Sequence, residues 1–201
     1  MNGWRHQQAR LFQIRRDPAV AGDRYEVTWG CAGSPDAEMV AYAEGRGTDM
    51  PDRLVFYTDR TMSWVLFVVR TSPFPHSRDA VHEVRDGSGA VIGSFRATFT
   101  ASPSRPEWTM RQGRALLLTG RERGTLTSAL RHAWDAFPLF RLPQTVWSSG
   151  FDFTTGSGER ALCVDRARER HGGHVLDVAS PVVDRRLAIA QAVALDSLWS
   201  R

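Results

Sequence analysis

The chain has 201 residues, of which 42% are hydrophobic and 24% charged, a composition typical of one soluble globular domain. All 26 basic residues are arginine and 22 residues are acidic, and the net charge of +4 is only a weak indication of nucleic acid or an anionic membrane surface as partner. Cys31 and Cys163 are too few and too far apart for a disulfide framework or a metal site. The N-terminal segment has no apolar stretch of the kind a secretory signal needs. We therefore expect a single cytoplasmic domain over residues 1–201 with reduced thiols.

Short apolar or alternating stretches, separated by turn residues, predict a mainly β chain. Residues 64–69 are apolar throughout, as in a strand buried on both faces. The turn Asp86-Gly87-Ser88-Gly89 predicts a hairpin between 81–85 and 90–99. One face of its second strand is expected to hold Val91, Gly93, Phe95, Ala97 and Phe99. The other predicted strands are 11–15, 25–30, 38–43, 54–58, 108–110, 115–119, 145–153, 162–169 and 174–178.

One internal segment has helical rather than strand periodicity. Residues 125–137 predict an amphipathic helix with Thr125 as N-cap and Pro138 as its stop. Its apolar positions are Leu126, Ala129, Leu130, Ala133, Trp134 and Phe137. Because the polar face is not rich in basic residues, we expect this helix to dock on the sheet rather than to lie in a membrane interface.

The C-terminal segment 182–199 predicts a second helix, which is apolar on every side between Leu187 and Leu195. Ser180 is the expected N-cap, and Arg185 and Arg186 are expected to bring the start of the helix to solvent. These charges and the short apolar run disfavour a membrane span, and an oligomer contact stays an alternative. A helix apolar all round in a β chain predicts a closed antiparallel barrel wrapped around it.

Three passages resemble a known family when taken in their order along the chain. They are a strand–turn–strand over 86–96 followed by Trp108, the strand Ala161-Leu162-Cys163-Val164-Asp165-Arg166, and a closing strand and helix over 176–196. They resemble the tubby-like superfamily, in its phospholipid scramblase and LURP-one-related branch. This resemblance implies a twelve-stranded β-barrel around a C-terminal helix, and it is clearest from about Leu54 onward.

The sequence also departs from that family. Eukaryotic scramblases have a proline-rich arm, a cysteine cluster for palmitoylation and an acidic calcium-binding stretch, and this sequence has none of the three. Tubby proteins bind phosphoinositide through a basic groove that includes a lysine, and this sequence contains no lysine. Lipid binding is therefore an expectation drawn from the fold.

Arginines in two places are candidates for binding an anion or a lipid headgroup. Arg166, Arg168 and Arg170 would share one face of the predicted strand 162–169, because strand side chains repeat every second residue. Arg121 and Arg123 flank Glu122 in the same alternating manner. The alternative is a solvated strand edge whose arginines pair with neighbouring carboxylates.

No sequence motif indicates an enzyme, a cofactor or a metal. The glycines at 87, 89 and 93 lead into a strand rather than a helix, which indicates a hairpin rather than a nucleotide loop. His171 and His174 are expected to decorate a turn, and Cys163 is expected to be a packed thiol.

We expect a non-enzymatic binding module that contacts anionic phospholipid at a membrane surface. The alternative is a soluble protein-interaction scaffold that uses residues 100–107 and the helix 125–137. No nucleic-acid partner is expected, and the oligomeric state stays open.

Overall fold

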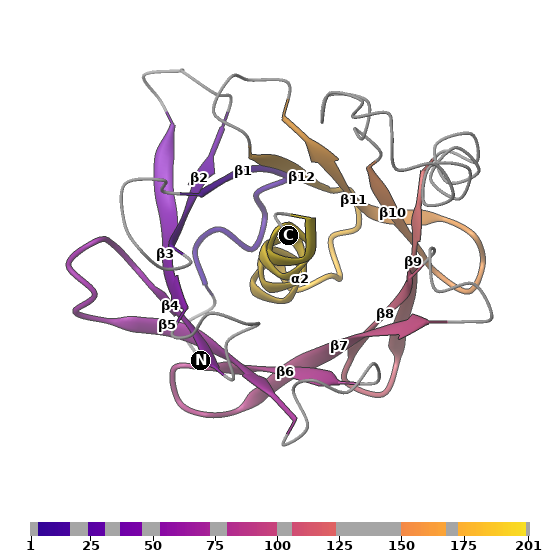
Figure 1. The fold of residues 1–201 in the computed structure, drawn as a ribbon, viewed down its shortest axis with the longest axis horizontal. Helices are drawn as coiled ribbons and strands as arrows, with labels where there is room; N and C mark the ends of the chain where they lie inside the picture. Colours follow the sequence, from indigo (N-terminus) through magenta and orange to yellow (C-terminus); the bar gives the residue numbers. More distant parts are fainter. Residues whose placement is uncertain are drawn as a thin grey trace, which may run out of the picture.

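The computed structural model describes residues 4–16, 24–30, 37–45, 53–72, 80–99, 106–123, 150–167 and 173–199. Its strands form one closed barrel in which each strand pairs antiparallel with its neighbours in sequence, and β1 closes the ring against β12 (Figure 1). The strands are β1 (Leu11–Arg16), β2 (Arg24–Trp29), β3 (Glu38–Gly45), β4 (Arg53–Tyr57), β5 (Val65–Thr71), β6 (Val81–Asp86), β7 (Val91–Phe99), β8 (Pro106–Gln112), β9 (Leu116–Glu122), β10 (Phe151–Thr154), β11 (Arg160–Arg166) and β12 (His174–Val178). The prediction of a mainly β, closed antiparallel barrel of twelve strands is confirmed.

The helix α2 (Arg185–Trp199) fills the centre of the ring, as Figure 1 shows. Its side chains from Leu187 to Val193 are at most 1% exposed, so the prediction of a buried C-terminal helix is confirmed. Gly93 on β7 permits the close approach, because a Cβ there would lie 2.7 Å from Leu187 Cδ2 and 2.5 Å from the Arg111 carbonyl oxygen. Among the described helical residues, none form a helix long and apolar enough to cross a membrane.

The start of α2 differs from the prediction, since the helix begins at Arg185 rather than at residue 182. Asp184 is the N-cap, and its carboxylate accepts the Arg186 backbone N–H at 2.9 Å. The preceding turn is fixed by two glutamines from opposite sides. Gln112 accepts from the Asp184 N–H at 2.7 Å, and Gln7 accepts from the Arg185 N–H at 3.2 Å. Ser180 is therefore not the cap, because these distant side chains satisfy the first helical N–H groups.

Arg185 was expected in solvent but is 3% exposed, and that prediction is wrong. Its guanidinium donates to the carbonyl oxygens of Ala9 at 2.8 Å, Ser180 at 2.7 Å and Val183 at 2.7 Å. Burial lowers the pKa of this guanidinium. Since Ala9 precedes β1, the buried side chain ties the N-terminal segment to the start of α2.

Four β-bulges lie at the end of the barrel where α2 begins, which we call the helix-start end. They interrupt the pairs β2–β3, β4–β5, β6–β7 and β10–β11. The bulge in β7 leaves Ile92 without a partner and sets Val91 opposite Arg85, so Val91 is 55% exposed and does not share the inner face of Gly93. The corresponding bulge in β5 lies at Leu66, and Trp64, before it, is 74% exposed, so the expected burial on both faces holds for Phe67 to Val69 and not for the start of the run.

Several predicted segments lie outside the described residues. They are most of the loop 100–107, the amphipathic helix 125–137, the first part of the strand 145–153, the last part of the strand 162–169 and His171. Those expectations stay predictions.

A charge placed on α2 should prevent folding. Ala190→Asp would bury an unpaired carboxylate at a site that is 0% exposed, at a cost of several kcal/mol, which is comparable to the stability of a domain. We expect insoluble or unfolded protein by circular dichroism, whereas Ala115→Asp, in an exposed turn, should fold normally. A soluble Ala190→Asp protein with an unchanged melting temperature would contradict the buried position of the helix.

His82 should make the barrel acid-sensitive. Burial lowers the pKa of this imidazole to about 4, while an unfolded histidine titrates near 6.5. Between these values the unfolded chain binds a proton that the folded chain does not, so stability should be full above pH 6.5 and fall by up to about 3 kcal/mol toward pH 4. Urea unfolding of wild type and His82→Phe should show a steeper decline with falling pH for wild type. Equal declines in the two proteins would rule out His82 as the source.

Candidate anion-binding site

The arginines proposed from sequence fall into two groups in the barrel wall. Arg121 on β9 donates to Glu107 at 2.8 Å. Arg123, just past β9, donates to Asp152 at 2.5 Å and to Asp165 at 3.0 Å, and the hydrogen bond with Asp152 raises its pKa. These two guanidinium groups therefore already hold carboxylates on β8, β10 and β11.

The third described member of the predicted set is less engaged. Arg166 is exposed and is the last residue of β11. The strand therefore carries no further arginine of the predicted face. Arg168 and Arg170 lie outside the described residues. Binding of an anion by these five arginines stays a prediction.

A different set of arginines is brought together by the register of β4 to β8. Arg53 on β4 lies directly opposite Arg70 on β5. Farther round the barrel, Arg96 on β7 lies opposite Thr109, and Arg111 on β8 lies opposite Ser94. All four side chains are exposed on strands whose alternate residues enter the core. We call Arg53, Arg70, Arg96 and Arg111 the arginine wall.

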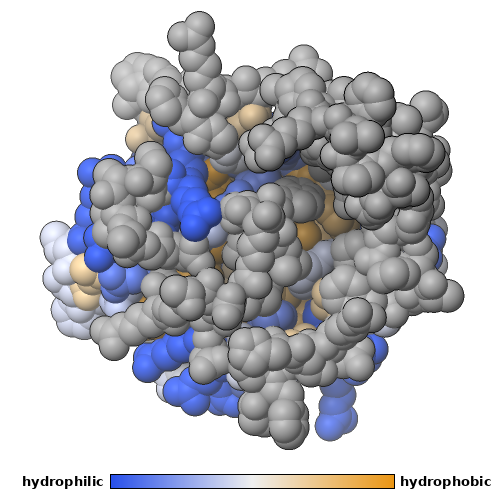
Figure 2. Space-filling model, in the orientation of Figure 1, coloured by the Kyte–Doolittle hydropathy of each residue, from blue (hydrophilic) through white to orange (hydrophobic). Residues whose placement is uncertain are grey.

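The arginine wall is not neutralised by the carboxylates of its own strands. Glu83 on β6 accepts from Arg85 at 2.6 Å, and Glu107 on β8 accepts from Arg121. Among the residues that the structure describes, no carboxylate forms an ion pair with the four arginines of the wall. From β4 to β8 the wall spans roughly 19 Å, at about 4.8 Å per strand. In Figure 2 hydrophilic residues follow the lower edge of the molecule, where Figure 1 places β5 to β8.

An apolar margin adjoins the arginine wall on β4 and β5. Beyond the Arg53–Arg70 pair, the register sets Val55 opposite Val68, and then Tyr57 opposite Val65. Exposure rises along this direction, since Val68 is 8% and Val65 43% exposed. The outside of β4 and β5 thus changes from cationic to apolar toward the helix-start end.

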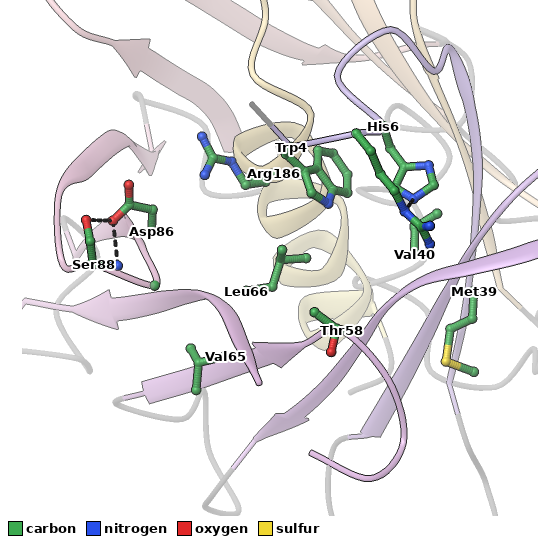
Figure 3. Close-up of a pocket in the computed structure, with 12 residues that line it drawn as sticks. Trp4, His6, Met39, Val40, Thr58, Val65, Leu66, Asp86, Ser88 and Arg186 are labelled. Atoms are coloured by element: carbon green, nitrogen blue, oxygen red, sulfur yellow. Dashed lines mark hydrogen bonds between the residues drawn. The ribbon is translucent and has the colours of Figure 1, made fainter. Parts of the chain in front are cut away.

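The helix-start end also contains a pocket of about 610 Å³, shown in Figure 3. Trp4, Met39, Val65 and Leu66 are among its apolar lining residues. Its charged groups are paired with one another or with close neighbours. Arg186 binds Asp184 at 2.7 Å, and Arg5 binds Glu38 and donates to His6 at 2.9 Å. The pocket therefore has fewer free cationic groups with which to bind an anion than the arginine wall has.

Burial also determines the state of His6 in this pocket. Loss of solvent, followed by the adjacent Arg5 charge, lowers the pKa of the imidazole. Since Nε2 accepts the hydrogen bond from Arg5, the ring is neutral with its proton on Nδ1. The ring also packs between Trp4 and Trp29, with centroid distances of 5.4 Å and 6.0 Å. His6 therefore acts as a packing and positioning group for Arg5.

The other residues considered for a catalytic or metal-binding role are held in structural contacts. Cys163 is 6% exposed, and burial raises the pKa of its thiol, as expected for a packed cysteine. His174 does not decorate a turn: it is buried, and its Nε2 lies 2.5 Å from Asp196 of α2. Within the described ranges, no group of three or more histidine, cysteine or acidic residues is arranged to hold a metal ion.

Sequence reasoning missed the arginine wall because its members are far apart in the chain. Only the strand register places Arg53 beside Arg70, and nothing local marks either residue. One signal in the sequence could have indicated two of them. Arg70 and Arg96 alternate with the core residues of their own strands, so each must face outward.

Removal of one wall arginine should stabilise the fold. Like charges directly opposite on a sheet repel, and Glu83, which lies opposite Arg70 on β6, is held by Arg85, so Arg70→Thr should raise the free energy of unfolding by about 0.5 kcal/mol at low salt. Arg123→Thr is the matched control, because it breaks ion pairs with Asp152 and Asp165 and should lower stability by about 0.5 kcal/mol. Denaturant unfolding at low salt and at about 1 M salt, which screens both effects, measures this. A destabilised Arg70→Thr protein would mean that Arg70 has a stabilising partner.

Comparison with known proteins gives no relative of this chain. No family model matches it, and no curated protein or solved structure matches it either. The candidate site therefore rests on the geometry of this barrel.

Proposed function

We propose that the protein is a non-enzymatic binding module that contacts anionic phospholipid at the cytoplasmic surface of a membrane through the arginine wall. The observation that carries this proposal is the direct pairing of Arg53 with Arg70, two exposed cations that form no ion pair with a described residue, since Glu83, opposite Arg70 on β6, pairs with Arg85. Such a pair opposes folding, and a bound anion would relieve the repulsion.

The chemistry of the wall suits phosphate groups. A guanidinium donates two parallel hydrogen bonds to phosphate oxygens, and it keeps its charge at any physiological pH. Each arginine held near an anionic lipid surface contributes about 1 kcal/mol of attraction. Four arginines spread over five strands fit a row of headgroups better than one small ion, because each guanidinium reaches a different phosphate.

We also propose membership of the tubby-like superfamily, in its phospholipid scramblase and LURP-one-related branch. A closed barrel of twelve antiparallel strands with a C-terminal helix supports this assignment. The binding role follows from the arginine wall, and the assignment would stand without it.

A binding role is favoured over a catalytic one by the groups beside the wall. Its neighbours on the outer face are Glu83, Ser94, Thr109 and valines, and Glu83, the one carboxylate among these neighbours, already accepts from Arg85 at 2.6 Å. The buried thiol of Cys163 lies on β11, away from these strands, and its raised pKa leaves it protonated.

Vesicle sedimentation tests the proposal. The protein should bind phosphatidylcholine vesicles that contain phosphatidylserine, and added salt should weaken the binding. Arg70→Glu should lower the affinity roughly 30-fold, because reversing one charge removes about 2 kcal/mol. Arg160→Glu makes the same change of charge at an exposed site on β11 and should have little effect.

Two results would contradict the proposal. Wild-type protein that stays in the supernatant with anionic vesicles would exclude lipid binding. Equal losses for Arg70→Glu and Arg160→Glu would mean that net charge, and not the wall, governs binding.

A further inference from the structure

We infer that the hairpin turn between β4 and β5 inserts into the membrane interface beside the arginine wall. This inference rests on the proposed function and adds an element that the wall itself does not contain. The inserted residues are Met62, Trp64 and Val65, which we call the apolar tip.

The apolar tip is unusually exposed for its composition. Trp64 is 74%, Val65 43% and Met62 37% exposed. A tryptophan has a large apolar body with one polar N–H, and it favours the boundary between headgroups and acyl chains. The β4–β5 turn projects outward from the ring at the left of Figure 1. The tip therefore presents apolar surface that the barrel leaves in water.

The turn that carries the tip is already ordered. The Asp59 carboxylate accepts from the Thr61 backbone N–H at 2.8 Å and from the Thr58 hydroxyl at 3.0 Å. The Thr58 N–H donates to the Trp64 carbonyl oxygen at 3.0 Å, which closes the turn, and an ion pair joins Arg60 to Glu26 on β2. Because these contacts fix the backbone before any contact with lipid, insertion loses little conformational entropy.

The tip is continuous with the arginine wall along one strand. On β5 the outer face passes from Arg70 through Val68 to Val65, the first residue of the strand, and Trp64 directly precedes it in the chain. Val91, on the neighbouring β6–β7 hairpin, is also exposed at this margin, and Gly87 of that turn lies against the Val65 carbonyl oxygen. A planar anionic surface that meets Arg70 along this strand therefore lies close to the tip as well.

Charge within the turn limits the depth of insertion. The hydrogen bonds from Thr61 and Thr58 lower the pKa of Asp59, so this carboxylate stays ionised, and Arg60 follows it directly. Charged groups are costly in the acyl region, so the tip should stop at the interface. The charge of the wall favours a bilayer over a second copy of the chain, because a second copy would bring an identical cationic surface.

Quenching of tryptophan fluorescence by lipids with brominated acyl chains tests the inference. On brominated vesicles of phosphatidylcholine and phosphatidylserine, wild-type fluorescence should fall on binding. Trp64→Phe should lose this quenching while it still sediments with the vesicles. Trp29→Phe is the matched control, because Trp29 is also exposed, at 43%, but packs against His6, and the variant should be quenched as wild type is.

The outcomes separate this inference from the proposed function. Binding with equal quenching of wild type and Trp64→Phe would overturn the insertion and leave the arginine wall in place. Absence of binding to any anionic vesicle would overturn both. A wild-type dimer in sedimentation equilibrium that becomes monomeric in Trp64→Ser would overturn the insertion as well, because the tip would then be a contact between copies.

Discussion

The architecture depends on how α2 fills the barrel. Eight strands enclose a space that side chains alone can fill, and twelve strands enclose a wider one, so a closed ring of this size needs an element inside. An alanine-rich helix meets this need, and Gly93 gives it room against β7. Arg185 then fixes the helix to the N-terminal segment through carbonyl oxygens rather than through a carboxylate. The strand register that places every outer residue follows from this closure.

Because α2 is buried inside the barrel, binding of a partner depends on the outer face of the strands. On the β9 side Arg121 is neutralised within the sheet by Glu107, and Arg123 by Asp152 and Asp165. On β4 and β5 the opposite arrangement holds, and Arg53 faces Arg70. A surface optimised only for stability would separate two such charges. The difference between these two sides of one barrel is the main physical reason to assign binding to β4–β8.

The sequence predicts the structural features that local residue patterns control. It does not predict the features that depend on contacts between distant residues. Burial of α2 follows from its uniform apolarity, and the hairpin at Asp86 follows from its turn residues. The start of α2 could not be predicted, because Gln7 and Gln112 fix it from more than sixty positions away. The bulges likewise break the alternation that places Val91 on the inner face, and the arginine wall exists only once the register is known.

The proposed function requires that the β4–β8 side of the barrel faces the membrane. Spin labels on single cysteines test it directly, in protein lacking Cys31 and Cys163, with a nickel-chelating lipid as relaxing agent. Ser94→Cys places the label on β7, opposite Arg111 of the arginine wall, and Val175→Cys places it on β12, which lies across the ring in Figure 1. On anionic vesicles we expect strong relaxation of the label at position 94 and weak relaxation at 175. Equal relaxation, or stronger relaxation at 175, would contradict this orientation.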